Sequence, residues 1–257
     1  INVGDTFTPT VSYSPADTST TKKGVTWTSG TASVATVDAA TGLITGVAPG
    51  TAVITAKSTA DNTLTATCTV TVNQPIKNIT LNKTTLALNK GTTDSTLTYS
   101  YVPTDTTDTG VSVSSSDPSV ATATVAEATK TVTIKALAKG STVITVASSK
   151  DSSKSATCNV TVHVPLESIS LDKTVLDLNP GLTGTLTVTY IPSDTDAAKS
   201  VTWATSDSSV ATVSAEGTVT AGTTYGTATI TATSTAFLAD GKTHATATCT
   251  VNVTERI

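Results

Sequence analysis

Short runs in which apolar and polar residues alternate recur along the whole chain of 257 residues. Strict alternation is the period of a β-strand with one buried face, as in the closely similar runs TAVITA, STVITV and TATITA. Within residues 75–164 the predicted strands lie near residues 76–81, 86–88, 97–102, 111–114, 120–125, 131–136, 141–147 and 156–163. Turn-rich segments separate these runs, and no helical period occurs. The pattern predicts an all-β chain whose repeating unit is an antiparallel two-sheet sandwich, best fitted by the immunoglobulin-like form.

The alternating runs belong to a unit that occurs three times. The segments TATCTVTVN, SATCNVTVH and TATCTVNVT place Cys68, Cys158 and Cys249 at intervals of 90 and 91 residues, and a Tyr-x-Pro precedes each of them. Pro75 and Pro165 follow the first two segments, and proline is typical of a boundary because it cannot donate to a strand ladder. We therefore predict three domains, called units one, two and three, which comprise residues 1–74, 75–164 and 165–257.

The joints between the units are short and contain no Gly/Ser-rich run. This predicts a stiff, elongated row of three sandwiches rather than a flexible string. Unit one has no counterpart of residues 75–88, because Asn2–Gly4 matches Asn89–Gly91. We expect an exposed edge and an uncovered core at the missing N-terminal strand segment, and we expect the chain to be part of a longer array.

Composition and charge narrow the range of partners. Charged residues make up 13% of the chain and the net charge is −4, with Arg256 as the single arginine. This balance argues against a nucleic acid or an anionic membrane surface as partner. No run approaches the roughly 18 apolar residues of a membrane span, so no membrane insertion is expected.

One cysteine per unit cannot form the disulfide that bridges the two sheets of a sandwich. Cys68 shares its strand face with Ala66 and Val70, which predicts a buried and inert thiol in each unit. An interchain bridge or a redox role is the alternative. The long spacing between the cysteines excludes a compact zinc cluster.

The histidines and aromatic residues give little sign of chemistry. His163 and His244 have no motif around them and are interpreted as surface histidines. Trp27 and Trp203 alternate in phase with core valines, so few aromatic side chains are left for a sugar-binding platform. No catalytic residue, cofactor or cofactor-binding residue is predicted.

Aspartates recur at one position of each unit. Asp17, Asp105 and Asp194 follow the recurring proline by two residues, where aspartate is typical of a turn. The alternative is a calcium site formed by Asp105 with Asp108, or by Asp194 with Asp196. The Asp-rich loop that surrounds calcium in an EF-hand is missing from the sequence, so no metal site is predicted.

The segments NPGLTGTLTVTYIPSDT, VTWATSDSSVATVSAEGTVTA, GTATITATS and TATCTVNV resemble the bacterial immunoglobulin-like domain of group 2, and all three units carry the pattern. Unit two departs from it at Val113, where the other units have tryptophan, and at Lys130, where they have glycine. The resemblance implies a non-enzymatic module of surface adhesins similar to intimin and invasin, of surface-layer proteins, or of phage tail and head appendages.

The resemblance leads to one preferred function and two alternatives. The preferred function is a non-catalytic structural or adhesive stalk segment of an extracellular, bacterial cell-surface protein. Its expected partners are a host-surface protein or glycan and neighbouring Ig-like domains of a longer chain. The alternatives are a phage virion decoration that makes weak contacts with host glycans, and an accessory module of an enzyme.

Unit three carries an insertion of five residues between its strand isoleucine and its cysteine, in the segment STAFLADGKTHAT. In an immunoglobulin-like sandwich this hairpin lies at the end where the chain enters the domain. We therefore expect Phe237 and Leu238 to pack against the base of unit two at His163, Val164 and Pro165. The alternatives are that the two side chains fold back onto unit three or form an exposed partner-binding tip.

Overall fold

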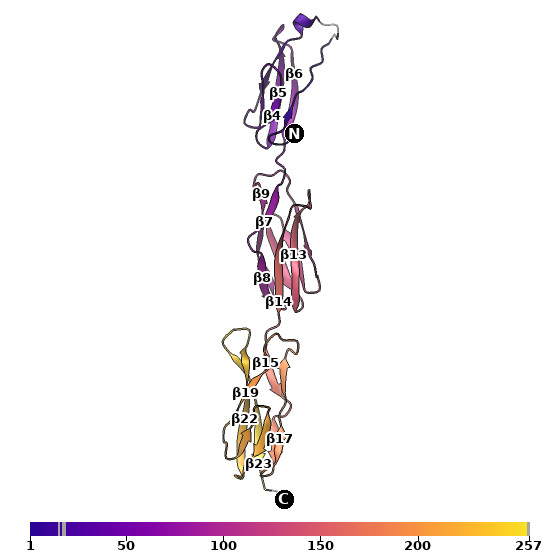
Figure 1. Ribbon diagram of the computed structural model, residues 1–257. Helices are drawn as coiled ribbons and strands as arrows, with labels where there is room; N and C mark the ends of the chain where they lie inside the picture. The colour runs from indigo at the N-terminus through magenta and orange to yellow at the C-terminus, as the bar shows by residue number, and fades with distance from the viewer. Residues whose placement is uncertain (15, 17–18, 256–257) are drawn as a thin grey trace.

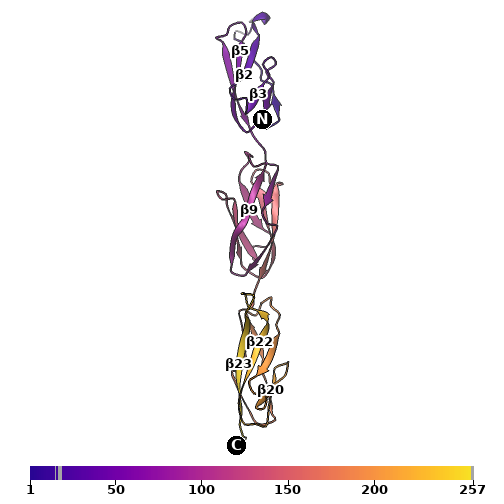
Figure 2. The same cartoon turned by 90° about the vertical axis from the view of Figure 1, so that its left-hand side faces the viewer.

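The computed structural model describes residues 1–14, 16 and 19–255, so Pro15, Asp17 and Arg256 lie outside the described residues. Three β-sandwiches stand end to end in an elongated row, with the two chain termini at its opposite ends (Figure 1). The row is also narrow in the perpendicular view (Figure 2). The fold class is therefore the predicted one: all-β, with tandem immunoglobulin-like sandwiches.

Unit two shows the complete sandwich. Its strands are β7 (Asn78–Leu81), β8 (Thr85–Asn89), β9 (Thr93–Val102), β10 (Val111–Ser115), β11 (Ala121–Ala126), β12 (Thr131–Ala136), β13 (Gly140–Ser148) and β14 (Ser155–His163). Each of the eight predicted strands is present. One sheet has the order β10-β13-β14-β8 and the other the order β11-β12-β9-β7. Inward-facing side chains such as Leu97, Ile134 and Ile144 are fully buried between them.

The expectation of a purely antiparallel sandwich needs one correction. Strand β8 pairs parallel to β14, with Thr85 opposite Asn159 and Asn89 opposite His163. The reason is a change of sheet: the chain leaves β7 in one sheet at Leu81 and enters the other sheet as β8. The second and last strands of the unit, β8 and β14, then run side by side in the same direction.

Units one and three repeat this plan with local differences. Unit one has β1 (Thr6–Phe7), the 3₁₀ turn η1 (Thr20–Lys22), β2 (Val25–Ser29), β3 (Ala35–Val37), β4 (Ile44–Gly46), β5 (Gly50–Ser58) and β6 (Thr65–Val72). Unit three has β15 (Ser168–Leu171), β16 (Val175–Leu178), β17 (Thr183–Thr185), β18 (Val188–Ile191), β19 (Val201–Thr205), β20 (Ala211–Val213), β21 (Thr218–Ala221), β22 (Gly226–Phe237) and β23 (His244–Val253). Counterparts of β7 and β8 are absent from the described part of unit one.

The cysteines follow the predicted inward phase. Cys158 and Cys249 are completely buried, and burial raises the pKa of each thiol. Cys68 is only partly buried. The difference arises because β8 lies beside β14 in unit two, whereas the described residues of unit one form no strand in that position beside β6.

The two departures of unit two from the family pattern are one coupled change. Gly42 has a φ of +75°, and a Cβ atom on it would lie 2.6 Å from Cε2 of Trp27. Gly217 lies over Trp203 in the same way. In unit two the smaller Val113 leaves space, and Lys130 adopts the left-handed turn conformation with a φ of 53°. The tryptophan therefore requires the glycine, and its loss permits a lysine.

Candidate functional site: the joints between the units

The surface at each joint comes from one loop of the following unit. In unit two this loop links β9 to β10, and in unit three it links β18 to β19. Both loops begin with the sequence Pro-x-Asp-Thr, at Pro103 and at Pro192. The polar side chains that follow the proline turn back toward the last residue of the preceding unit, whose backbone groups have left the sheet and need partners.

The first joint is closed by hydrogen bonds around Gln74. The hydroxyl of Thr106, which is 8% exposed, donates to the carbonyl oxygen of Gln74 at 2.8 Å. The backbone N–H of Thr107 donates to the same oxygen at 2.9 Å, and the Thr107 hydroxyl accepts from the N–H of Gln74 at 3.0 Å. The Asp108 carboxylate accepts from the N–H of Ile76 at 3.2 Å.

The second joint repeats the arrangement around Val164. The hydroxyl of Thr195, which is 5% exposed, donates to the carbonyl oxygen of Val164 at 2.9 Å. The N–H of Asp196 donates to that oxygen at 2.8 Å, and the Asp196 carboxylate accepts from the N–H of Val164 at 2.8 Å. Asp196 thus takes the place of Thr107, and the same backbone pattern gains a negative charge.

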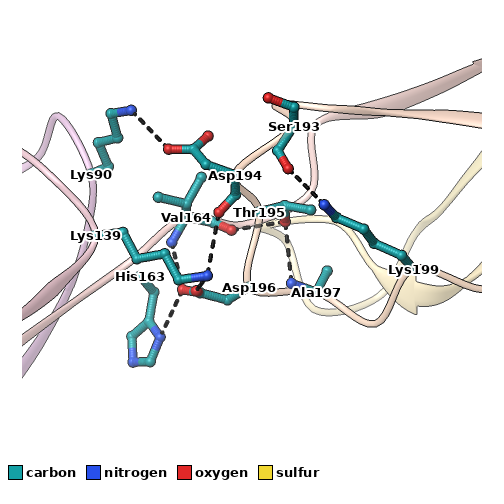
Figure 3. Close-up of polar contacts among 10 residues, drawn as sticks. All are labelled: Lys90, Lys139, His163, Val164, Ser193, Asp194, Thr195, Asp196, Ala197 and Lys199. Atoms are coloured by element: carbon teal, nitrogen blue, oxygen red, sulfur yellow. Dashed lines mark hydrogen bonds and ion pairs between the residues drawn. The ribbon is translucent and has the colours of Figure 1, made fainter.

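Two lysines and a histidine of unit two contact this aspartate and the neighbouring Asp194 (Figure 3). Lys139 Nζ lies 2.5 Å from Asp196 Oδ1 and 3.4 Å from the carbonyl oxygen of Asp194. Lys90 Nζ lies 3.3 Å from Asp194 Oδ2, and His163 Nδ1 lies 3.3 Å from Asp196 Oδ2. Lys139, the N–H of Val164 and His163 together lower the pKa of Asp196. We call these five side chains, Lys90, Lys139, His163, Asp194 and Asp196, the ionic clamp.

The first joint has no counterpart of the ionic clamp among the described residues. The middle residue of the Asn-x-Gly segment is Val3 in unit one, whereas it is Lys90 in unit two. Unit one has Pro49 before the strand glycine, where unit two has Lys139. Together with Thr107 in place of Asp196, these exchanges leave a joint that is closed by hydrogen bonds, one of them to the Asp108 carboxylate, without an ion pair among the described residues. The two joints therefore share a backbone geometry and differ in their ion pairs.

The structure places the predicted contact residues in two different groups. His163 and Val164 belong to the second joint, and Pro165 follows them directly. The Phe237 ring lies 4.3 Å from the His244 ring within its own hairpin and remains 51% exposed. Leu238 forms a bridge to Leu166 and packs against the core of unit three. The partners of both inserted side chains thus lie within unit three, and the loop after Pro192 closes the joint instead.

Three of the four aspartates weighed as calcium ligands have protein partners in the joints. Asp194 and Asp196 face lysine ammonium groups, and Asp108 accepts a backbone N–H. Over the described ranges, His, Cys, Asp and Glu side chains do not gather in groups of three or more that could hold a metal ion. Helices long and apolar enough to cross a membrane are likewise absent from the part of the chain that the structure describes.

Sequence reasoning missed the residues that close the joints. Thr106, Thr195 and Lys139 are ordinary in type, and threonine is abundant throughout the chain. The available signal was the recurrence of Pro-x-Asp-Thr, including residues 15–18 of unit one, of which 15, 17 and 18 lie outside the described residues. The motif predicts a turn at its aspartate, and the sequence does not distinguish the threonine beside it from the many other threonines of the chain.

The repeated sandwiches and their joints define a tandem immunoglobulin-like protein. The family model of the bacterial Ig-like domain (group 2) matches residues 1–70 and 165–251, which is more than half of the chain. The chain therefore belongs to this family. No curated protein matches it in a sequence comparison.

Several solved structures are similar to this chain in a structure comparison. Domains 4 and 5 of the S-layer protein SbsC are 28% identical over 55% of this chain and 70% of that chain, with a TM-score of 0.32. SbsC domains 4–9 are 22% identical over 92% of this chain and 40% of that chain, with a TM-score of 0.33. Human CDH23 EC21-23 is 12% identical over 88% of both chains, with a TM-score of 0.49.

Proposed function

We propose that the chain is a non-catalytic spacer that holds its units at a defined distance in an extracellular, bacterial cell-surface protein. The domains proposed are residues 1–74, 75–164 and 165–257. The observation that carries the proposal is the repeated closure of the joints by the same buried threonine, Thr106 in one and Thr195 in the other. In a chain of freely jointed modules, the joints would not bury a hydrogen-bonded side chain at the same position each time.

The chemistry of the described residues supports a mechanical rather than a catalytic role. His163 lies in the ionic clamp, and His244 stacks on Phe237. The neighbouring Ig-like domains of a longer chain are the first partners that we propose, and a host-surface protein or glycan is the second. No observation on the described residues favours a virion appendage over the cell surface. Release of peptides of this chain when intact cells are treated with protease would test the location.

Small-angle scattering tests the spacer role. A compact globule of 257 residues has a radius of gyration of about 18 Å, so the row of units should give a clearly larger value. Thr106→Val and Thr195→Val each remove one hydroxyl from a buried carbonyl and should broaden the distribution of overall length. Thr106→Ser and Thr195→Ser keep the hydroxyl and serve as matched controls. A compact radius, or a distribution that none of the valine variants alters, would contradict the spacer role.

A further inference from the structure

Unit three contains an open groove of about 390 Å³ between β18 and β19, which belong to different sheets. Val188 and Tyr190 of β18 line one side of it, and Val201 and Trp203 of β19 line the other. The entering strand β15 is in place beside β18, with Ile169 opposite Tyr190, so the groove is a feature of a complete sandwich. Its volume lies in the range of small-ligand pockets, about 300 to 1,000 Å³.

The groove is open because one hairpin of unit three is short. In unit two Ala121 pairs with Ala136, whereas in unit three the corresponding Ala211 pairs with Ala221. The hairpin between β20 and β21 is therefore five residues shorter than the hairpin between β11 and β12. The place that the longer hairpin covers in unit two is left uncovered in unit three.

Unit two shows which groups occupy this place when it is filled. Glu127 Oε1 accepts the backbone N–H of Val111 at 3.3 Å. The carbonyl oxygen of Lys130 accepts the N–H of Tyr99 at 3.1 Å, and Lys130 Nζ lies 5.2 Å from the centroid of the Tyr101 ring. The place therefore takes a carboxylate and a carbonyl oxygen on backbone N–H groups, and a further group over the face of a tyrosine.

The corresponding N–H groups of unit three are open. The odd-numbered residues of β18 hydrogen-bond to β15, so the N–H groups of Val188 and Tyr190 point away from that strand. The even-numbered residues of β19 hydrogen-bond to β22, so the N–H groups of Val201 and Trp203 point away as well. Within the part of the chain that the structure describes, none of these four N–H groups has a protein acceptor.

Two side chains add further donors to the groove. Lys199 lines it, and its ammonium group uses one donor on the carbonyl oxygen of Ser193 at 2.6 Å (Figure 3). The hydroxyl of Tyr190 has no hydrogen-bond partner among the described residues, whereas that of Tyr101 in unit two accepts the N–H of Gly110 at 2.9 Å. Burial raises the pKa of Tyr190, so its phenol remains a donor. The excess of donors favours a ligand that carries a negative charge.

The groove also offers aromatic surface. Trp27 of unit one is 7% exposed, whereas its counterpart Trp203 is only partly buried. The expectation that the tryptophans are committed to the core therefore holds fully only for Trp27. Trp203 and Tyr190 line the groove together with Thr187, and Glu216, the acidic residue of the lining, already accepts the hydroxyl of Ser214 at 2.8 Å. Aromatic faces beside polar groups suit a ring that has both an apolar face and hydroxyl groups.

We propose that the groove of unit three binds an acidic sugar, whose carboxylate accepts the N–H of Val201 and faces Lys199. The carboxylate takes the place that Glu127 has in unit two, and the sugar ring lies over Tyr190, where unit two has the Lys130 ammonium group. A sugar ring is favoured over an acidic peptide because aromatic faces and hydroxyl groups surround the open N–H groups. The inference rests on the glycan partner proposed above and is independent of the spacer role.

Amide NMR of the full chain with D-glucuronic acid tests the proposal. Saturable shifts are expected for the backbone amides of Val188, Val201 and Trp203. The amides of Tyr99 and Val111 in unit two should not move, because Lys130 and Glu127 already occupy their N–H groups. D-glucose lacks the carboxylate and propionate lacks the ring, and each should bind at least tenfold more weakly than D-glucuronic acid.

Two pairs of variants locate the site. Tyr190→Phe removes a hydroxyl that has no protein partner and should weaken binding at least threefold, whereas Tyr225→Phe, at a side chain outside the groove that is 57% exposed, should not change it. Lys199→Gln should weaken binding at least fivefold, whereas Lys135→Gln in unit two should not change it. An unchanged spectrum of the remaining residues shows that each variant is folded.

Four results would overturn the proposal. They are the absence of saturable shifts at millimolar D-glucuronic acid, equal binding of glucose, equal binding of propionate, and equal binding by Tyr190→Phe and Tyr225→Phe. Saturable shifts at residues outside the groove would also overturn this site, although they would support the glycan partner. None of these outcomes alters the spacer role, because scattering tests it on the chain without a ligand.

Discussion

Replacing Asp196 by threonine should give the second joint the same side chain that the first joint has at this position, where Thr107 stands. The threonine hydroxyl can accept the N–H of Val164, as Thr107 accepts that of Gln74. The contacts to Lys139 and His163 have no replacement. The variant therefore removes the carboxylate that faces Lys139 and His163 while it keeps a hydrogen-bond acceptor for the backbone.

The expected loss of free energy in the closed joint follows from the solvent exposure of the side chains that Asp196 contacts. The side chains of Asp196, Lys139 and His163 are 28%, 48% and 51% exposed, so solvent screens both contacts of the Asp196 carboxylate. Exposed pairs of this kind contribute about 0.2 to 1 kcal/mol each. A hydrogen bond to a charged acceptor is also stronger than one to a hydroxyl. We expect a total loss of about 1.5 kcal/mol, which corresponds to roughly a tenfold rise in the population of open joints.

Distances between spin labels measure this population. Labels at Lys135→Cys in unit two and Thr220→Cys in unit three report on the second joint, in a background with the native cysteines replaced by alanine. Lys57→Cys with Lys135→Cys reports on the first joint. Asp196→Thr should broaden only the distance distribution across the second joint, measured between residues 135 and 220. In the parent chain, 1 M salt should have a similar effect on the second joint, because the Debye length falls to about 3 Å.

Asp207→Thr is the matched control, because it removes one carboxylate beyond the opposite end of β19, away from the clamp. It should leave both distributions unchanged. The reasoning is refuted if Asp196→Thr leaves the second joint as narrow as before. It is also refuted if salt broadens both joints equally, since the first joint carries no ion pair among the described residues.

Three further predictions follow from single contacts. Gly42→Ala should lower the free energy of unfolding of unit one by about 2 kcal/mol, because the new Cβ would meet Trp27 in a left-handed turn. Lys130→Gly should change the free energy of unfolding of unit two by less than about 1 kcal/mol. Calorimetry measures both values, and similar effects of the two substitutions would contradict the coupling of Gly42 with Trp27. Cys68 should react with a polar thiol reagent faster than Cys158 and Cys249, whose pKa values are raised by burial, and equal native rates would exclude this explanation. The pKa of Asp196 is lowered in the closed joint, so its contribution to closing the joint is complete above the ordinary carboxyl range and is lost as pH falls through the lowered value. The distance distribution across the second joint should therefore broaden below about pH 4 in the parent chain. An equal response in Asp196→Thr would show that another group causes the effect.

The alternation of apolar and polar residues determined the strands and the inward face of each. This worked because a strand with one buried face imposes a period of two on its own sequence, as in β14, which contains the buried Cys158. The parallel pairing of β8 with β14 could not be obtained in the same way. It depends on the change of sheet between Leu81 and Thr85, and period-two alternation is the same for a strand in either sheet.

The joints were decided by the tertiary structure. The sequence drew attention to Phe237 and Leu238, because exposed apolar residues in a polar loop stand out, yet their partners lie within unit three. The second joint is closed by Thr195 and Asp196, and Lys139 reaches the latter across 57 residues of chain. The sequence does not show which polar side chain of a common type contacts a partner that is distant along the chain. Only the end-to-end placement of the folded units brings their charges within reach of one another.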